Sequence, residues 1–174
     1  MYRQVEGILM LGKLFGKKKL PKEETIMAPL SGTVRQLEEV PDPVFAGKMV
    51  GDGIAIEPSD GIVVAPFDAE VVQLFPTKHA IGLRGKSGLE VLIHIGLETV
   101  SLKGEGFEAF IKQGDQVKMG EKLVQFDMTI VKEKANGTIT PVIMTNGDIV
   151  ENFDISEDST VVAGKSKLMQ VQMK

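Results

Sequence analysis

The chain has 174 residues, which is short enough for one domain and long enough to bury roughly 68–70% of the surface of its unfolded state. With 43% hydrophobic and 25% charged residues it is not intrinsically disordered, and the absence of cysteine excludes a disulfide scaffold and a thiol nucleophile. Glycine and proline are so widely spread that only residues 121–136 and 148–163 are free of both over more than ten positions. Because both residues interrupt helices, a helix bundle, a coiled coil and a βαβ-repeat enzyme are excluded.

The N-terminal segment is basic, whereas the rest of the chain is acidic. Residues 1–22 carry a net charge of +5 within a total of −4, which leaves −9 on the remainder. Their apolar run at 8–11 is too short to span a bilayer or to form the core of a signal peptide. A short helix here would contact an anionic membrane surface weakly, and a solvated tail is the alternative. We expect residues 1–24 to be a flexible leader and residues 25–174 to be a single domain, whose acidic charge disfavours nucleic acid as a partner.

From residue 25 onward the sequence predicts short strands separated by turns, because β-branched and aromatic residues alternate with Gly, Pro, Asp and Ser. A short helix is expected near residues 129–135 and one helical turn at 107–112. Together these elements predict an all-β fold, an antiparallel β-sandwich or barrel with only short helical turns. The expected strands are 25–28, 32–37, 54–56, 61–64, 69–75, 80–84, 89–95, 121–126, 138–143 and 167–173.

A faint repeat supports this fold. Residues 27–34 and 64–71 both contain an Ala-Pro pair between two strand-like segments, and the two copies are 37 residues apart. Two copies do not make a solenoid. A duplicated β-motif within one sandwich explains the repeat better.

The chain has two histidines, His79 and His94, so any chemistry that needs three imidazoles from one chain is excluded. Between them a glycine-framed turn at 85–88 separates two strand-like segments, which is the pattern of a tight hairpin. If the two central residues of this turn form the loop, His79 lies directly opposite His94. Their Cβ atoms would then be roughly 4.5–5.5 Å apart on one face.

Two facing imidazoles fit phosphoryl chemistry better than metal binding, because a durable zinc site needs three or four protein ligands. Neutral imidazole is a nucleophile at neutral pH, and a second imidazole can hydrogen-bond the oxygens of the transferred group. Thr77 is placed to accept the Nδ1 proton of His79, which would leave Nε2 for the phosphate. The alternative is two ordinary strand histidines and a strand threonine at the edge of a turn.

Five segments carry the most specific pattern of the chain. They are Ala-Pro-Leu-Ser-Gly at 28–32, Phe-Ala-Gly-Lys-Met-Val-Gly-Asp-Gly-Ile-Ala-Ile at 45–56, Thr-Lys-His-Ala at 77–80, Leu-Ile-His-Ile-Gly-Leu-Glu-Thr-Val at 92–100 and Leu-Lys-Gly-Glu-Gly-Phe at 102–107. In these segments the sequence resembles the glucose-type enzyme IIA family of the phosphoenolpyruvate–sugar phosphotransferase system. The resemblance extends from about Thr25 to the C-terminus. The fold that it implies is an antiparallel β-sandwich with a duplicated motif.

The resemblance implies a phosphotransferase component that works as a phosphoryl relay. His94 is then phosphorylated at Nε2, accepting the group from the carrier protein HPr and passing it to a cysteine of the sugar-specific enzyme IIB domain. His79 hydrogen-bonds the phosphoryl group, Thr77 orients His79, and the backbone carbonyl of Gly96 orients His94. The implied partner-binding residues are the apolar Val44, Phe45, Met49, Val50, Phe75, Ile81, Leu92 and Val100 and the acidic Asp42 and Glu98. The family usually has aspartate where this chain has Glu98.

The same resemblance implies a cytoplasmic protein without a cofactor, with zinc at His79 and His94 only as a shared or adventitious ion. Because the chain has its own Met1 and leader, we expect a stand-alone protein, and we expect it to be a monomer. Regulatory binding to permeases or kinases, as in some relatives, is an alternative. The sequence does not identify the sugar.

Two other classes of function fit the residues less well. A biotinyl- or lipoyl-carrier module is suggested by residues 28–34 and 114–123, but the Met-Lys-Met sequence that commonly marks the modified lysine is absent. A zinc peptidase on a similar duplicated motif would need more histidines than this chain has.

Overall fold

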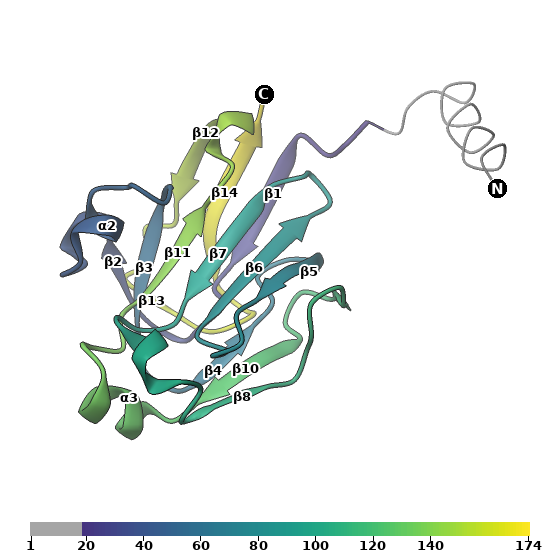
Figure 1. Ribbon diagram of the computed structural model, residues 1–174. Coiled ribbons are helices and arrows are strands. Elements are labelled where there is room, and N and C mark those ends of the chain that lie inside the picture. Colours follow the sequence, from purple (N-terminus) through teal and green to yellow (C-terminus); the bar gives the residue numbers. More distant parts are fainter. Residues whose placement is uncertain (1–18) are drawn as a thin grey trace, which may run out of the picture.

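The computed structural model describes residues 19–174, so most of the predicted leader lies outside the described residues. The strands of the described part all pair antiparallel and form three sheets (Figure 1). The largest sheet has the order β13 (Thr160–Val161), β2 (Gly32–Gln36), β3 (Asp52–Pro58), β11 (Thr140–Met144), β7 (Glu90–His94), β6 (Ala80–Gly85), β5 (Ala69–Leu74) and β9 (Gln116–Val117). The smaller sheets are β1 (Glu23–Met27), β14 (Lys167–Met173) and β12 (Val150–Ile155), and β4 (Ile62–Val64), β10 (Lys122–Phe126) and β8 (Phe107–Ala109).

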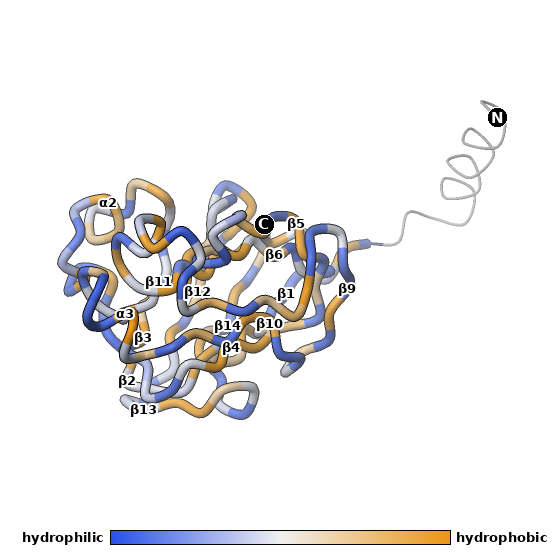
Figure 2. The backbone as a smooth tube through the Cα atoms, turned by 60° about the horizontal axis from the view of Figure 1, so that its bottom comes forward, coloured by the Kyte–Doolittle hydropathy of each residue, from blue (hydrophilic) through white to orange (hydrophobic). Residues whose placement is uncertain are grey.

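The core lies between the inner face of the large sheet and the two smaller sheets. Ile81 and Ile93 from the large sheet, Val171 from β14 and Leu123 from β10 belong to one cluster of fully buried side chains. Hydrophobic segments run along these strands, and many connecting loops are hydrophilic (Figure 2). The prediction of an antiparallel all-β fold with only short helices is confirmed.

The helical segments are short, and one prediction about them is wrong. Helix α3 (Met128–Lys134) begins within one residue of the predicted segment. The segment 107–112 contains no helical turn: residues 107–109 form strand β8 and the chain then leaves the sheet, with Phe107 and Ile111 buried and Glu108 and Phe110 exposed, a period of two. The remaining short helices are α2 (Pro43–Ala46) and the 3₁₀ turns Leu37–Glu39, Thr99–Leu102 and Gly147–Ile149.

Strand predictions also missed β12 and β13, which lie in the glycine- and proline-free segment 148–163. Strand β12 is largely exposed at the edge of a small sheet, so it lacks the strong apolar pattern of the buried strands. Helix α2 was missed as well, although an Asp before a Pro is a helix-start signal. Asp42 accepts the Val44 N–H at 2.9 Å and caps this helix.

The sequence repeat forms two copies of one turn that bind each other. The Met27 N–H donates to the Pro66 carbonyl at 2.9 Å, and the Val64 N–H, at the equivalent place in the second copy, donates to the Pro29 carbonyl at 2.8 Å. Strand β13 pairs with β2 in the same register as β9 pairs with β5. The duplicated motif therefore relates the two halves of the large sheet by an approximate twofold symmetry.

One difference between the two halves leaves part of the outer face of the sheet open. The β2–β3 connection is long and packs Leu37, Val40 and Phe45 against Ala55 and Ile143 of the sheet. The equivalent β5–β6 connection, residues 75–79, is too short to cover the sheet in this way. The rings of His79 and His94 lie together on the outer face over β6 and β7. The β2–β3 connection borders this face through Phe45, and His94 is only partly buried.

We expect Gly53→Ala to destabilise the fold by about 3 kcal/mol, because the added Cβ would lie 2.1 Å from the Val142 carbonyl oxygen of the neighbouring strand. Gly147→Ala is the matched control, since its Cβ would meet no atom within 4 Å. Urea denaturation of both variants measures the difference. Equal stability of the two variants would contradict the close packing of β3 on β11.

Candidate functional site

The hairpin of β6 and β7 carries the site, and its register differs from the predicted one by one residue. Ala80, not His79, pairs with His94, because the Gly85 N–H bonds the Leu89 carbonyl at 2.9 Å and leaves a three-residue loop. Gly88, with a φ of 90°, supplies the left-handed residue that such a loop requires. The expectation that the two histidines are directly opposite on regular strands is therefore wrong.

The two rings nevertheless lie together, with centroids 5.0 Å apart and planes at 79°. In a regular strand a shift of one residue would place His79 on the opposite face. His79 instead lies in a turn just before β6, where Lys78 adopts a φ of 62° and its N–H bonds the Phe75 carbonyl at 2.7 Å. This turn directs the His79 side chain to the face of His94.

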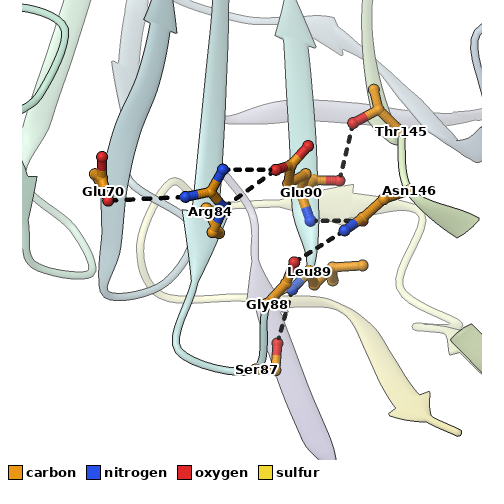
Figure 3. Close-up of polar contacts among 8 residues, drawn as sticks. All are labelled: Glu70, Arg84, Ser87, Gly88, Leu89, Glu90, Thr145 and Asn146. Carbon is orange, nitrogen blue, oxygen red and sulfur yellow. Dashed lines mark hydrogen bonds and ion pairs between the residues drawn. The ribbon is translucent and has the colours of Figure 1, made fainter. Parts of the chain in front are cut away.

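The far end of the hairpin is fixed by a polar network that sequence reasoning missed. The Asn146 side chain donates to the Gly88 carbonyl at 2.9 Å and accepts the Glu90 N–H at 2.8 Å, as a paired strand would (Figure 3). Arg84 lies between Glu90 and Glu70, with ion-pair distances of 3.0 and 4.0 Å (Figure 3). These contacts hold the register that places the histidines.

His94 has a defined tautomer. Its Nδ1 lies 2.8 Å from the Gly96 carbonyl oxygen, which can only accept, so Nδ1 carries the proton and Nε2 has a free lone pair. The Phe45 ring packs on the imidazole with centroids 4.8 Å apart. Burial lowers the pKa of His94 below 6.5, against the opposing effects of the Gly96 hydrogen bond and the Asp42 carboxylate. His94 is therefore mainly neutral at pH 7, with an unprotonated Nε2.

His79 is only 3% exposed and is held from two sides. Its Nδ1 lies 2.5 Å from the Thr77 hydroxyl, and the edge of its ring contacts Phe75 with centroids 5.4 Å apart. Burial, together with the neighbouring His94, lowers the pKa of His79 to about 4. Both imidazoles are therefore neutral near pH 7.

This buried imidazole predicts a loss of stability in acid. Above pH 6.5 His79 is neutral in both the folded and the unfolded chain, whereas between pH 6.5 and about 4 the unfolded chain binds a proton that the folded chain excludes. The stability of the fold should therefore fall by about 3 kcal/mol over this range because of His79. Urea denaturation at pH 7.5 and 4.5 tests this. His79→Gln should lose less stability than the wild type on acidification, and an equal loss would contradict the lowered pKa.

Comparison with known proteins identifies the family. A family model described as "phosphoenolpyruvate-dependent sugar phosphotransferase system, EIIA 1" matches residues 24–150. The chain belongs to this family. It is therefore an EIIA component of the sugar phosphotransferase system, as the sequence motifs indicate.

The EIIA family assignment is supported over nearly the whole chain. A Bacillus anthracis protein named "PTS system glucose-specific EIIA component" is 54% identical over 95% of this chain and 100% of its own length, and one from Halalkalibacterium halodurans is 51% identical over 94% and 99%. The solved structure of glucose permease IIA from Mycoplasma capricolum matches with a TM-score of 0.81 and 42% identity, over 86% of this chain and 96% of that one. The alignment with the Bacillus anthracis protein covers more than residues 25–174, so it includes part of the basic N-terminal segment.

The expected docking residues of this EIIA chain differ in exposure. Met49, Val100 and Val44 are 77%, 58% and 42% exposed, and Val44 and Met49 lie within four residues of Phe45, whose ring packs on His94. Ile81 is 0% exposed in the main core, so its expected place in an exposed ring is wrong. It faces inward because it pairs with Ile93 on the core side of the hairpin. The remaining expected apolar residues are partly exposed, namely Val50, Phe75 and Leu92, or buried against His94, namely Phe45.

The two expected acidic residues have different surroundings. Asp42 caps α2 and is close enough to raise the pKa of His94. The Glu98 carboxylate instead accepts a hydrogen bond from the Asn136 amide at 2.6 Å. Asn136 follows α3 and was not singled out in the sequence.

Within residues 19–174, no three His, Cys, Asp or Glu side chains are grouped so that they could hold a metal ion. None of the helices in that part of the chain is long and apolar enough to cross a membrane.

Proposed function

We propose that this EIIA chain carries a phosphoryl group on Nε2 of His94, in the cytoplasm, between HPr and a cysteine of an enzyme IIB domain. The observation that supports it most directly is the Nδ1–Gly96 hydrogen bond, which leaves an unprotonated Nε2 on a partly exposed ring. The relatives named as glucose-specific support glucose as the sugar of the system. The pairing of β1 with β14, the last strand, supports residues 25–174 as one domain that carries this function.

The transfer needs no proton to move at His94. Its Nε2 lone pair forms the new N–P bond while the bond from phosphorus to the imidazole of phospho-HPr breaks. Nδ1 keeps its proton, and the Gly96 carbonyl accepts that hydrogen bond throughout. In the second transfer a cysteine thiolate of enzyme IIB attacks the phosphorus and the N–P bond breaks.

His79 is positioned to donate a hydrogen bond to the phosphoryl oxygens from Nε2. A neutral imidazole does this only when Nε2 carries the proton, and then Nδ1 must accept a hydrogen bond. We infer that the Thr77 hydroxyl donates to Nδ1 of His79, since their 2.5 Å contact permits either direction. This replaces the expectation that the hydroxyl accepts the Nδ1 proton, because that arrangement would leave Nε2 of neutral His79 unable to donate.

The exposed apolar side chains around His94 fit a transient docking surface. A partner that covers Met49, Val100 and Val44 would exclude water from the phosphohistidine and so limit hydrolysis. Because HPr and enzyme IIB would use the same surface in turn, the interaction must be reversible.

Labelling with ³²P tests the proposal. The purified chain is incubated with labelled phosphoenolpyruvate, enzyme I and HPr, and we expect one phosphoryl group per chain that is labile in acid and stable in base. Omission of HPr should prevent labelling. A label that is stable in acid, or a prosthetic group found on a lysine by intact-mass measurement of the native protein, would contradict the relay.

A further inference from the structure

The turn that presents the Gly96 carbonyl to His94 is anchored to the segment after α3. The Leu97 N–H donates to the Gly137 carbonyl at 3.1 Å, and the Asn136 N–H donates to the Leu97 carbonyl at 3.1 Å. Gly96 itself has a φ of 70°, so the turn depends on a left-handed residue directly after the site strand. The position of the carbonyl that fixes the His94 tautomer therefore depends on these anchors.

A side-chain contact reinforces the same anchor. Glu98 also has a left-handed φ, 57°, which residues other than glycine rarely adopt. Its carboxylate accepts a hydrogen bond from the Asn136 amide at 2.6 Å. Such backbone outliers persist where the surrounding structure holds them, and they concentrate at functional sites.

The role of Glu98 differs from that of the other acidic residue near the site. Asp42 acts on His94 through its charge, since it raises the pKa of that imidazole. The Glu98 carboxylate is bound by the side-chain amide of Asn136, and no effect of its charge on the pKa of His94 accompanies that of Asp42. This points to an effect on the shape of the turn.

We propose that Asn136 and Glu98 are positioning residues for His94. Their side-chain hydrogen bond holds the 95–98 turn, so that the Gly96 carbonyl stays in line with Nδ1 of His94 and Nε2 stays free of a proton. The effect on phosphoryl transfer rests on the proposed function, whereas the effect on the tautomer does not.

The test uses the full chain and compares loss of the Asn136–Glu98 hydrogen bond with a double variant in which donor and acceptor are exchanged. Asn136→Ala should lower the initial rate of labelling by phospho-HPr about three- to fivefold, as expected for loss of one exposed charged hydrogen bond. It should also raise the fraction of His94 with the proton on Nε2, measured by ¹⁵N NMR of the ring without phosphate. Asn136→Asp alone should be at least as harmful, because two carboxylates would then face each other.

Adding Glu98→Gln to Asn136→Asp restores the contact with donor and acceptor exchanged. This double variant should recover the wild-type tautomer, which is measured without any partner protein. Gln172→Ala is the matched control, because it removes an exposed amide–carboxylate hydrogen bond to Glu23, 2.9 Å long, on the β1–β14 sheet. It should change neither measurement.

An unchanged tautomer in Asn136→Ala would overturn the proposal, even if the rate falls, because the residue would then act on docking. Failure of the double variant to recover the tautomer would also overturn it. If the wild-type chain takes no phosphoryl group from HPr, the proposed function fails, while the NMR comparison still decides the positioning role.

Discussion

His94→Gln is expected to abolish phosphoryl acceptance from HPr. An amide nitrogen has no available lone pair, so the nucleophile is lost while a side chain of comparable size remains beside Phe45. From the effect of removing nucleophiles in other enzymes, the rate should fall by at least about 10⁴-fold. The measurement is the initial rate of ³²P transfer from phospho-HPr, with the variant at the same concentration as the wild type.

The loss of phosphoryl acceptance should result from the missing nucleophile and not from unfolding of the variant. His94 is partly exposed, and burial disfavours its charged form, so its replacement by a neutral amide should leave the thermal midpoint close to that of the wild type. Labelling that survives in His94→Gln would show that another residue accepts the phosphoryl group. His79 would then be the first residue to test.

His79→Gln should have a different effect, because it should still accept the phosphoryl group but donate it poorly. Acceptance needs the Nε2 lone pair of His94, whose tautomer is set by Gly96 and not by His79. Transfer onward to enzyme IIB needs a donor held against the phosphoryl oxygens, and a glutamine amide lacks the ring geometry that Thr77 fixes at 2.5 Å. By analogy with removing one donor from an oxyanion hole, the donation rate should fall about 10²–10³-fold.

A chase experiment separates the two steps. His79→Gln is labelled with phospho-HPr, isolated, and mixed with enzyme IIB and sugar, and the loss of label is followed in time. Thr77→Val should show a smaller defect in the same step, because it removes only the contact that orients His79. Thr145→Val is the matched control, since its hydroxyl bonds the Glu90 carbonyl at the other end of the hairpin. Normal donation by His79→Gln would contradict the assigned role.

Much of the fold could be predicted from sequence because it depends on local pattern. Alternating apolar residues predicted most of the buried strands, and the frequent glycines and prolines excluded long helices. The predicted helical turn at 107–112 is wrong, because the burial there has a period of two. Strand β12 is not predicted, because it lies exposed at the edge of its sheet and lacks a strong apolar pattern. These elements are stabilised by their neighbours in space.

At the site, too, residue types could be predicted from sequence, whereas the contacts between distant segments could not. The two histidines and the motifs around them were sufficient to indicate the EIIA family, and the phosphoryl relay that they predict is the function proposed above. The predicted register was nevertheless wrong by one residue, and Ile81 was assigned to the surface although it faces the core. The hairpin register depends on Asn146, which is distant in sequence. Its side-chain oxygen accepts the Glu90 N–H and its side-chain nitrogen donates to the Gly88 carbonyl.

By itself, the sequence determined the fold class, the duplicated motif and the family, because these depend on residue type and spacing. The tertiary structure alone decided how the two imidazoles meet. The left-handed turn at Lys78 offsets a register that would otherwise separate them, and the Gly96 carbonyl selects the tautomer of His94. The direction of a side chain and the position of a proton depend on contacts between segments far apart in the chain, and the 95–98 turn with its partner Asn136 is one such contact.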